Sequence, residues 1–241
     1  LRQFAYSQLE NDPQVLTDTH KSHCTYYLQY LNKRTSSMQQ SRHSLEEIDR
    51  ELDNIRAAWY WGVEKHEFDL LQQAARALDS YYTLKGYLVE GSNTFQAAAD
   101  AVRMVRNLRP SEKIDALFIE FQIFTANFLN WLSQYDKTRQ IIEEIYPLAE
   151  KSQNLKQMAE ILLVWGIRLY LTADYTAGLL KMEKALELVR QTDARQLESD
   201  ILRNIGNVLI DIEDVNNTRA GEYYRQSLEI CRQIGDRRGE S

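Results

Sequence analysis

Two histidines and a cysteine lie close together near the start of the chain, at His20, His23 and Cys24. Residues three and four positions apart share one face of a helix, so two imidazoles and a thiol could bind one metal ion. No second group of ligands accompanies them, because His43 and His66 stand alone in polar stretches. We therefore expect packed or solvated imidazoles here and no metal site.

Adjacent carboxylates offer a second kind of chemistry, at Glu46 and Glu47 and at Glu143 and Glu144. An acid and a base must approach the same substrate, but neighbouring residues on a helix point about 100° apart. Both pairs lie among other charged residues, as is typical of a solvated helix face. Spacing assigns no Ser-His-Asp or Cys-His arrangement, and no phosphate-binding glycine loop is present. We expect neither catalysis nor a bound cofactor in this segment.

The elements that carry these residues are predicted to be helices throughout. The 241 residues include only 9 glycines and 3 prolines, both of which interrupt helices. Apolar residues recur every three or four positions, and no stretch alternates with period two over the length of a strand. Turn-forming residues divide the chain into about eleven helices. Pro147, in "EEIYPLAEK", is expected to kink or end its helix.

A small residue recurs every forty positions, at Ala126, Gly166 and Gly206. In each copy it is followed by an apolar or aromatic residue after the turn, then a small one, then a large one: Tyr135, Thr138 and Ile142; Tyr175, Gly178 and Met182; Val215, Ala220 and Tyr224. Small residues facing each other allow two antiparallel helices to approach closely. A helical glycine costs about 1 kcal/mol relative to alanine, so a close helix crossing at Gly166 is the expected compensation.

This pattern resembles the tetratricopeptide repeat, in which an apolar-x-x-apolar-Gly stretch marks the first helix and Gly-Asp-Tyr or similar marks the turn. The resemblance covers residues 112 to 235 well and is weaker at "YYTLKGYLVEGSNTFQAAADA" upstream. Longer helices account for a period above the ~34 residues of the common form. The resemblance implies an all-α fold, a right-handed α-solenoid superhelix of antiparallel helix pairs with repeats of about forty residues.

In such an array one face of each first helix lines the concave groove, where a protein or peptide binds. Counted from the central small residue, the candidate residues are Ile123, Asn127, Asn130, Trp131, Leu163, Ile167, Tyr170, Arg203, Asn207 and Asp211. Asn127, Asn207 and Arg203 could hold a peptide backbone or a terminal carboxylate. The alternative is that they are ordinary polar groove residues, since the lysines expected from neighbouring repeats are missing.

A second resemblance covers roughly residues 1 to 98. The stretch "EEIDRELDNIRAAWYWGVEKHEFD", with Asp53 to Ala58 as its most specific run, looks like a junction in bacterial STAND regulators. In these signal-transduction ATPases an NB-ARC-type nucleotide-binding module and a winged helix precede a repeat array. The resemblance implies that residues 1–10 end a winged-helix-like domain, 11–110 form helical pairs linking to the array, and 111–241 form a truncated array. ATP or ADP is expected only in the upstream module, because this chain lacks its phosphate loop, Walker B acid and nucleotide-sensing histidine.

Charge and hydropathy limit the partners. The net charge is −6 and the basic residues are interleaved with acidic ones, which argues against direct binding of nucleic acid. The apolar run from Ile161 to Ile167 is far shorter than the ~20 residues of a membrane span, and no signal leader opens the chain. Two cysteines, Cys24 and Cys231, do not make a disulfide framework. We expect a cytoplasmic segment of a longer protein.

The favoured hypothesis is a sensor array whose concave surface binds a protein, a peptide or a small effector. In the intact regulator it would couple occupancy to the upstream nucleotide-binding domain in cis. One alternative is a passive scaffold that mediates assembly or self-association through exposed repeat faces. Another is an enzyme fragment in which the array cradles a substrate.

Overall fold

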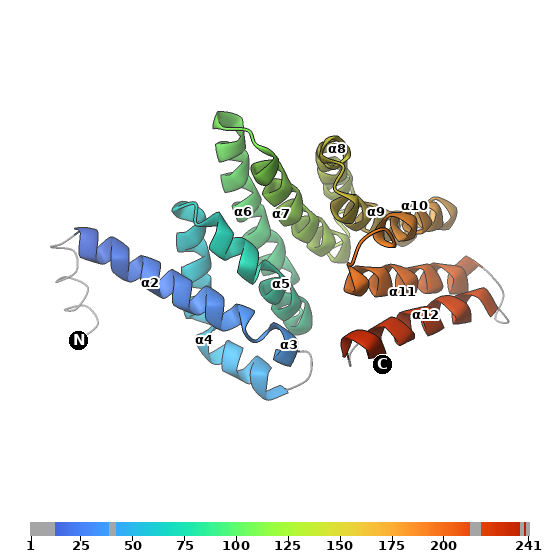
Figure 1. The fold of residues 1–241 in the computed structure, drawn as a ribbon, viewed down its shortest axis with the longest axis horizontal. Helices are drawn as coiled ribbons and strands as arrows, with labels where there is room; N and C mark the ends of the chain where they lie inside the picture. The colour runs from blue at the N-terminus through green and yellow to red at the C-terminus, as the bar shows by residue number, and fades with distance from the viewer. Residues whose placement is uncertain (1–12, 39–41, 213–217, 237–238, 240–241) are drawn as a thin grey trace. The chain divides into compact units, whose positions relative to one another are not determined.

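The structure is a computed structural model that describes residues 13–38, 42–212, 218–236 and 239. Helices joined by short turns make up this described part, which contains no strand. The prediction of an all-α fold is confirmed. The chain divides into two compact units, Leu1–Gly86 and Tyr87–Ser241, which are described separately (Figure 1). Within the described ranges, no helix combines the length and the apolar character needed to cross a membrane.

The first unit contains the helices α2 (Pro13–Asn32), α3 (Thr35–Met38), α4 (Arg42–Glu64) and α5 (Phe68–Lys85). Helix α2 packs against both α4 and α5, and its buried residues are Cys24, Leu28 and Leu31. Helix α5 ends at Gly86, whose φ of 69° lies in the left-handed region that favours glycine. The unit therefore has a buried core of its own.

The second unit contains seven helices in its described residues: α6 (Leu88–Leu108), α7 (Glu112–Trp131), α8 (Tyr135–Ser152), α9 (Leu155–Leu171), α10 (Tyr175–Val189), α11 (Arg195–Ile212) and α12 (Thr218–Ile234). Each of them packs against the next one along the chain. Several turns are fixed by side-chain caps, since Ser111, Asn154 and Asp174 each accept a hydrogen bond from a backbone N–H three residues later. Within the described residues of this unit, the predicted turns lie between these helices.

The small residues lie at close helix crossings, as predicted. A Cβ atom on Gly166 would stand 2.6 Å from Met182 Cγ and 3.0 Å from the carbonyl oxygen of Gly178. A Cβ on Gly178 would in turn stand 3.0 Å from the carbonyl oxygen of Gly166. On Gly206 it would meet the ring of Tyr224 at 2.8 Å, and Ala126 is completely buried. These residues permit the contact between the two helices of each pair.

Pro147 and the predicted domain division can now be compared with these helices. Helix α8 does not end at Pro147 but continues to Ser152, with Ile145 and Ala149 buried on either side of the proline. The division of the chain into 1–10, 11–110 and 111–241 stays a prediction. In the structure the second unit begins at Tyr87 and includes α6. The physical reason is aromatic packing, since the ring of Phe95 lies 4.8 Å from that of Phe124 on α7. Residues 1–10 and Val215 lie outside the described residues.

Candidate binding surface

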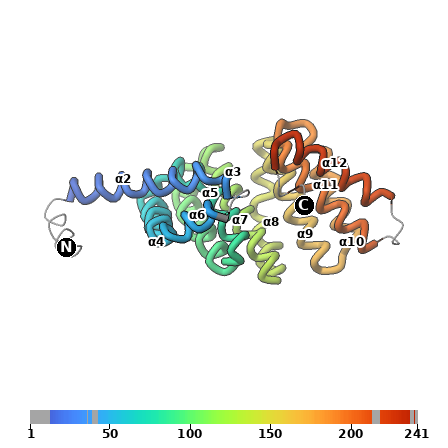
Figure 2. The backbone as a smooth tube through the Cα atoms, turned by 90° about the horizontal axis from the view of Figure 1, so that it is seen from below, coloured from blue at the N-terminus to red at the C-terminus, as the bar shows by residue number. Residues whose placement is uncertain are grey.

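The first helices of the three repeats lie next to one another. Helix α7 contacts α9 and α9 contacts α11, and Figure 2 traces these helices through the second unit. Polar groups connect them: Gln157 donates to the carbonyl of Ala116 at 2.8 Å, and Asn130 donates to the carbonyl of Val164 at 3.2 Å. We call the surface formed by the ten candidate residues of α7, α9 and α11 the first-helix face.

The ten candidate residues differ in exposure. Ile123, Asn130 and Leu163 are buried; Asn127, Ile167 and Tyr170 are half-buried; Trp131, Arg203, Asn207 and Asp211 are exposed. The three buried side chains support the face from below, and Asn130 uses its amide to hold α9. Direct contact with a partner is open to the other seven. Their role in binding stays a prediction.

Large apolar side chains reach solvent where the first helices end. Trp131 is 66% exposed, Ile210 is 56% exposed and Leu171 is 38% exposed. Trp131 was a candidate, but Leu171 and Ile210 were missed. The forty-residue period could have identified both in the sequence, because Leu171 is the counterpart of Trp131 and Ile210 is the counterpart of Tyr170.

Three tyrosines gather beside this face around two polar residues of α11. The hydroxyl of Tyr170 donates to Asp211 Oδ2 at 2.6 Å, and that of Tyr224 donates to Asn207 Oδ1 at 2.8 Å. The ring of Tyr175 lies 5.8 Å from that of Tyr170. We call Tyr170, Tyr175, Asn207, Asp211 and Tyr224 the tyrosine cluster. Tyr175 and Tyr224 were recognised only as repeat positions, since their approach depends on how α10 and α12 fold back.

The hydrogen bond to Asp211, with burial second, raises the pKa of Tyr170 to about 12. Burial, with a smaller contribution from the charge of Asp211, also raises the pKa of Tyr224. Both hydroxyls are therefore protonated at neutral pH and act as hydrogen-bond donors. Each protonated hydroxyl donates one hydrogen bond and keeps a lone pair that can accept another.

Two of the three proposed clamp residues, Arg203 and Asn207, are engaged within the chain. Arg203 donates to Asp200 at 2.8 Å, one turn earlier on α11, and Asn207 accepts from Tyr224. Arg203 would therefore have to leave Asp200 to hold a terminal carboxylate. Asn207 keeps its amide N–H groups for a partner, since Tyr224 occupies only the oxygen.

His20, His23 and Cys24, in the first unit, are held by packing. Cys24 is completely buried, and burial raises the pKa of its thiol to about 11. The rings of His20 and Trp61 are stacked, with centroids 6.2 Å apart, and the ring of His23 lies 4.6 Å from that of Tyr27. In the described part of the chain, no three His, Cys, Asp or Glu side chains are grouped to hold a metal ion.

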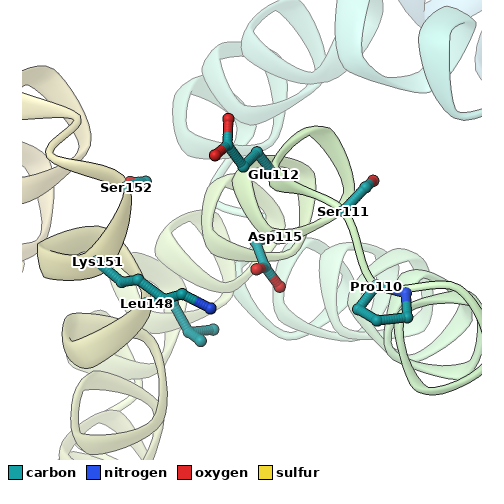
Figure 3. A pocket seen from close by; sticks show the side chains of 7 residues that line it. All are labelled: Pro110, Ser111, Glu112, Asp115, Leu148, Lys151 and Ser152. Atoms are coloured by element: carbon teal, nitrogen blue, oxygen red, sulfur yellow. The ribbon is translucent and has the colours of Figure 1, made fainter.

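A cleft of about 250 Å³ lies between the start of α7 and the end of α8 (Figure 3). It is lined by Pro110, Ser111, Glu112, Asp115, Leu148, Lys151 and Ser152. Ser111 already caps α7, and Asp115 accepts a hydrogen bond from Arg106 at 2.5 Å. Two of its polar residues, Ser111 and Asp115, are thus engaged in contacts within the fold.

The chain matches no protein-family model, and no curated protein sequence matches it. Among solved structures, it is similar to BtubC (BKLC) from P. vanneervenii, with 15% identity and a TM-score of 0.52 over 84% of this chain and 74% of that one. It is also similar to a signal transduction ATPase with numerous domains (STAND) that has a tetratricopeptide repeat sensor, from Pyrococcus horikoshii. There the identity is 14% and the TM-score 0.52, over 81% of this chain and 28% of that one.

This chain therefore corresponds to little more than a quarter of the STAND protein. At such identities the likeness concerns the fold alone. Together with the close crossings at forty-residue intervals, it shows an all-α array of tetratricopeptide-like helical repeats.

Proposed function

We propose that this chain is a non-catalytic binding module that recognises a protein or peptide on the first-helix face. The observation that carries the proposal is that each of the three first helices ends with an exposed apolar side chain: Trp131 on α7, Leu171 on α9 and Ile210 on α11. Aromatic and aliphatic side chains of this kind anchor partners at protein interfaces.

We further propose that the module is the sensor region of a STAND ATPase that regulates signalling or transcription in the bacterial cytoplasm. Two observations support this: the junction-like sequence around Asp53 to Ala58, and the fold shared with a STAND protein. ATP or ADP would bind to a nucleotide-binding domain in cis, and this segment would hold neither cofactor nor nucleic acid. The partner must bind more tightly to one conformation of that ATPase than to another, because equal affinity for two conformations does not change their populations.

Selection of short random peptides displayed on phage tests the binding proposal. We expect the immobilised chain to enrich specific peptides, and Trp131→Ala to weaken their binding about tenfold or more, as for an interface anchor. The matched control is Leu180→Ala on α10, which removes a side chain that is 65% exposed but lies outside the first-helix face. Equal effects of both substitutions would contradict the proposed surface. A constitutive oligomer in light scattering, with no peptide enriched, would instead favour a passive scaffold.

A further inference from the structure

Among the residues that the structure describes, Asp211 is a carboxylate without a counter-ion. The other acidic residues of α11 are neutralised, since Glu198 pairs with Arg190 and Arg195 and Asp200 pairs with Arg203. Asp211 is exposed and accepts a hydrogen bond from Tyr170, but it forms no ion pair with any residue in the described ranges. A neutral hydroxyl orients the carboxylate and leaves its charge in place.

The oxygens around Asp211 can only accept hydrogen bonds from a ligand. A tyrosine hydroxyl has one proton, and those of Tyr170 and Tyr224 are already donated to Asp211 and Asn207. Their remaining lone pairs and the carboxylate need a ligand rich in N–H donors. An anion or a neutral carbonyl group would find no hydrogen-bond donor among these oxygens.

The rings add a second preference for positive charge. Those of Tyr170 and Tyr175 are tilted at 51° with centroids 5.8 Å apart, and both are only half-buried. Aromatic faces attract ammonium and guanidinium groups, most strongly where water is partly excluded. A carboxylate and aromatic rings in one place favour a lysine or an arginine side chain.

Three residues in the cluster or next to it in the sequence favour a peptide over a free amine. The Asn207 amide keeps its N–H groups, which fit a backbone carbonyl next to the basic residue. Ile210, 56% exposed, and Leu171, 38% exposed, offer contacts for an adjoining apolar side chain. A small amine would leave these groups unused.

We propose that the tyrosine cluster is a subsite for a lysine or arginine side chain of a peptide segment in the partner. Asp211 supplies the charge, Tyr170 and Tyr175 the aromatic surface, and Tyr224 an accepting oxygen. This inference rests on the proposed function, since it names the chemistry of the peptide bound at the first-helix face.

The peptides enriched by phage selection on the whole chain provide the probe. We expect a lysine or arginine at a constant position, and about a tenfold loss of affinity when norleucine replaces it. Asp211→Asn should cause a similar loss on the native peptide and little further loss on the norleucine peptide. The substitution keeps an acceptor for Tyr170, so the fold is preserved. Glu229→Gln, which removes an exposed charge on α12 outside the cluster, should change nothing.

The outcomes separate this inference from the proposed function. Enriched peptides without a basic residue, bound equally well by the Asp211→Asn variant, would overturn the subsite and leave the binding module standing. A library that yields no specific peptide would overturn both. Spermidine that binds the chain more tightly than the peptides, and loses affinity with Asp211→Asn, would assign the cluster to free amines and refute a peptide partner.

Discussion

Gln122 is the residue whose surroundings fit its chemistry least. It is completely buried on α7, and neither its amide oxygen nor its nitrogen has a hydrogen-bond partner in the described part of the chain. The positions forty and eighty residues later are Leu162 and Leu202, both buried. One repeat therefore carries an amide where the other two carry a hydrocarbon.

We expect Gln122→Leu to raise the free energy of unfolding by about 1–2 kcal/mol, because an unsatisfied buried amide costs about 1–3 kcal/mol. Urea denaturation would measure it. Gln157→Leu is the matched control. The Gln157 amide donates to the carbonyl of Ala116, so this substitution should lower the free energy of unfolding. A less stable Gln122→Leu variant would mean that the amide is satisfied by internal water.

Tyr170 reports on the charge of Asp211. Its folded pKa of about 12 lies above the usual value of about 10, so its hydrogen bond stabilises the fold fully below pH ~10 and is lost as the pH rises through ~12. In NMR spectra of ring-labelled tyrosine we expect its phenol to remain protonated at pH ~11. Asp211→Asn should return the pKa of Tyr170 towards 10. A titration that is identical in both proteins would place the carboxylate away from the hydroxyl.

The helix pair is the element on which the fold depends, and its glycines are not equivalent. At Gly166 the carbonyl of Gly178 would stand only 3.0 Å from an added Cβ, and backbone cannot move aside as a flexible side chain can. At Gly221, within α12, an added Cβ would meet nothing within 4 Å. Substitutions at Gly166 and Gly221 therefore separate the cost of a glycine within a helix from its role in packing.

Gly221→Ala should raise the unfolding free energy by about 0.5–1 kcal/mol through helix propensity. Gly166→Ala should lower it by about 1–3 kcal/mol, because overpacking of the crossing outweighs that gain. Thermal or urea unfolding of the two variants compares them directly. If both substitutions stabilise the protein, then α9 and α10 do not need a glycine to cross.

Helix boundaries could be predicted from the sequence because they depend on local chemistry, such as the caps at Ser111 and Asn154. The exposure of single side chains on the first-helix face could not be predicted from the sequence, because it depends on what covers each repeat. Asn130, Tyr170 and Ile210 occupy equivalent positions, yet the first is buried, the second is half-buried and the third is 56% exposed. Of the two outcomes expected at Pro147, a kink or a helix end, the end does not occur, since the buried residues around it hold α8 together despite one missing N–H.

At the scale of the whole molecule, packing divides the chain into two units. Helix α6 joins the second unit through Phe95 and through Gly91, where a Cβ would stand 2.6 Å from the Phe128 ring. Each unit has a core of its own. The predicted binding residues all lie on helices of the second unit.

The net charge of −6 acts on every approaching partner, whereas Asp211 acts only on contact. For the basic peptides expected at the tyrosine cluster, long-range attraction speeds association and is screened within about 10 Å at 0.1 M salt. Stopped-flow measurements between ~0.05 and ~0.5 M salt should show an association rate that falls several-fold while the dissociation rate changes little. Asp211→Asn should do the reverse and mainly raise the dissociation rate, because it removes a contact of the bound state. If salt and the substitution changed the same rate constant, binding would depend on the overall field, and the cluster would not be a specific subsite.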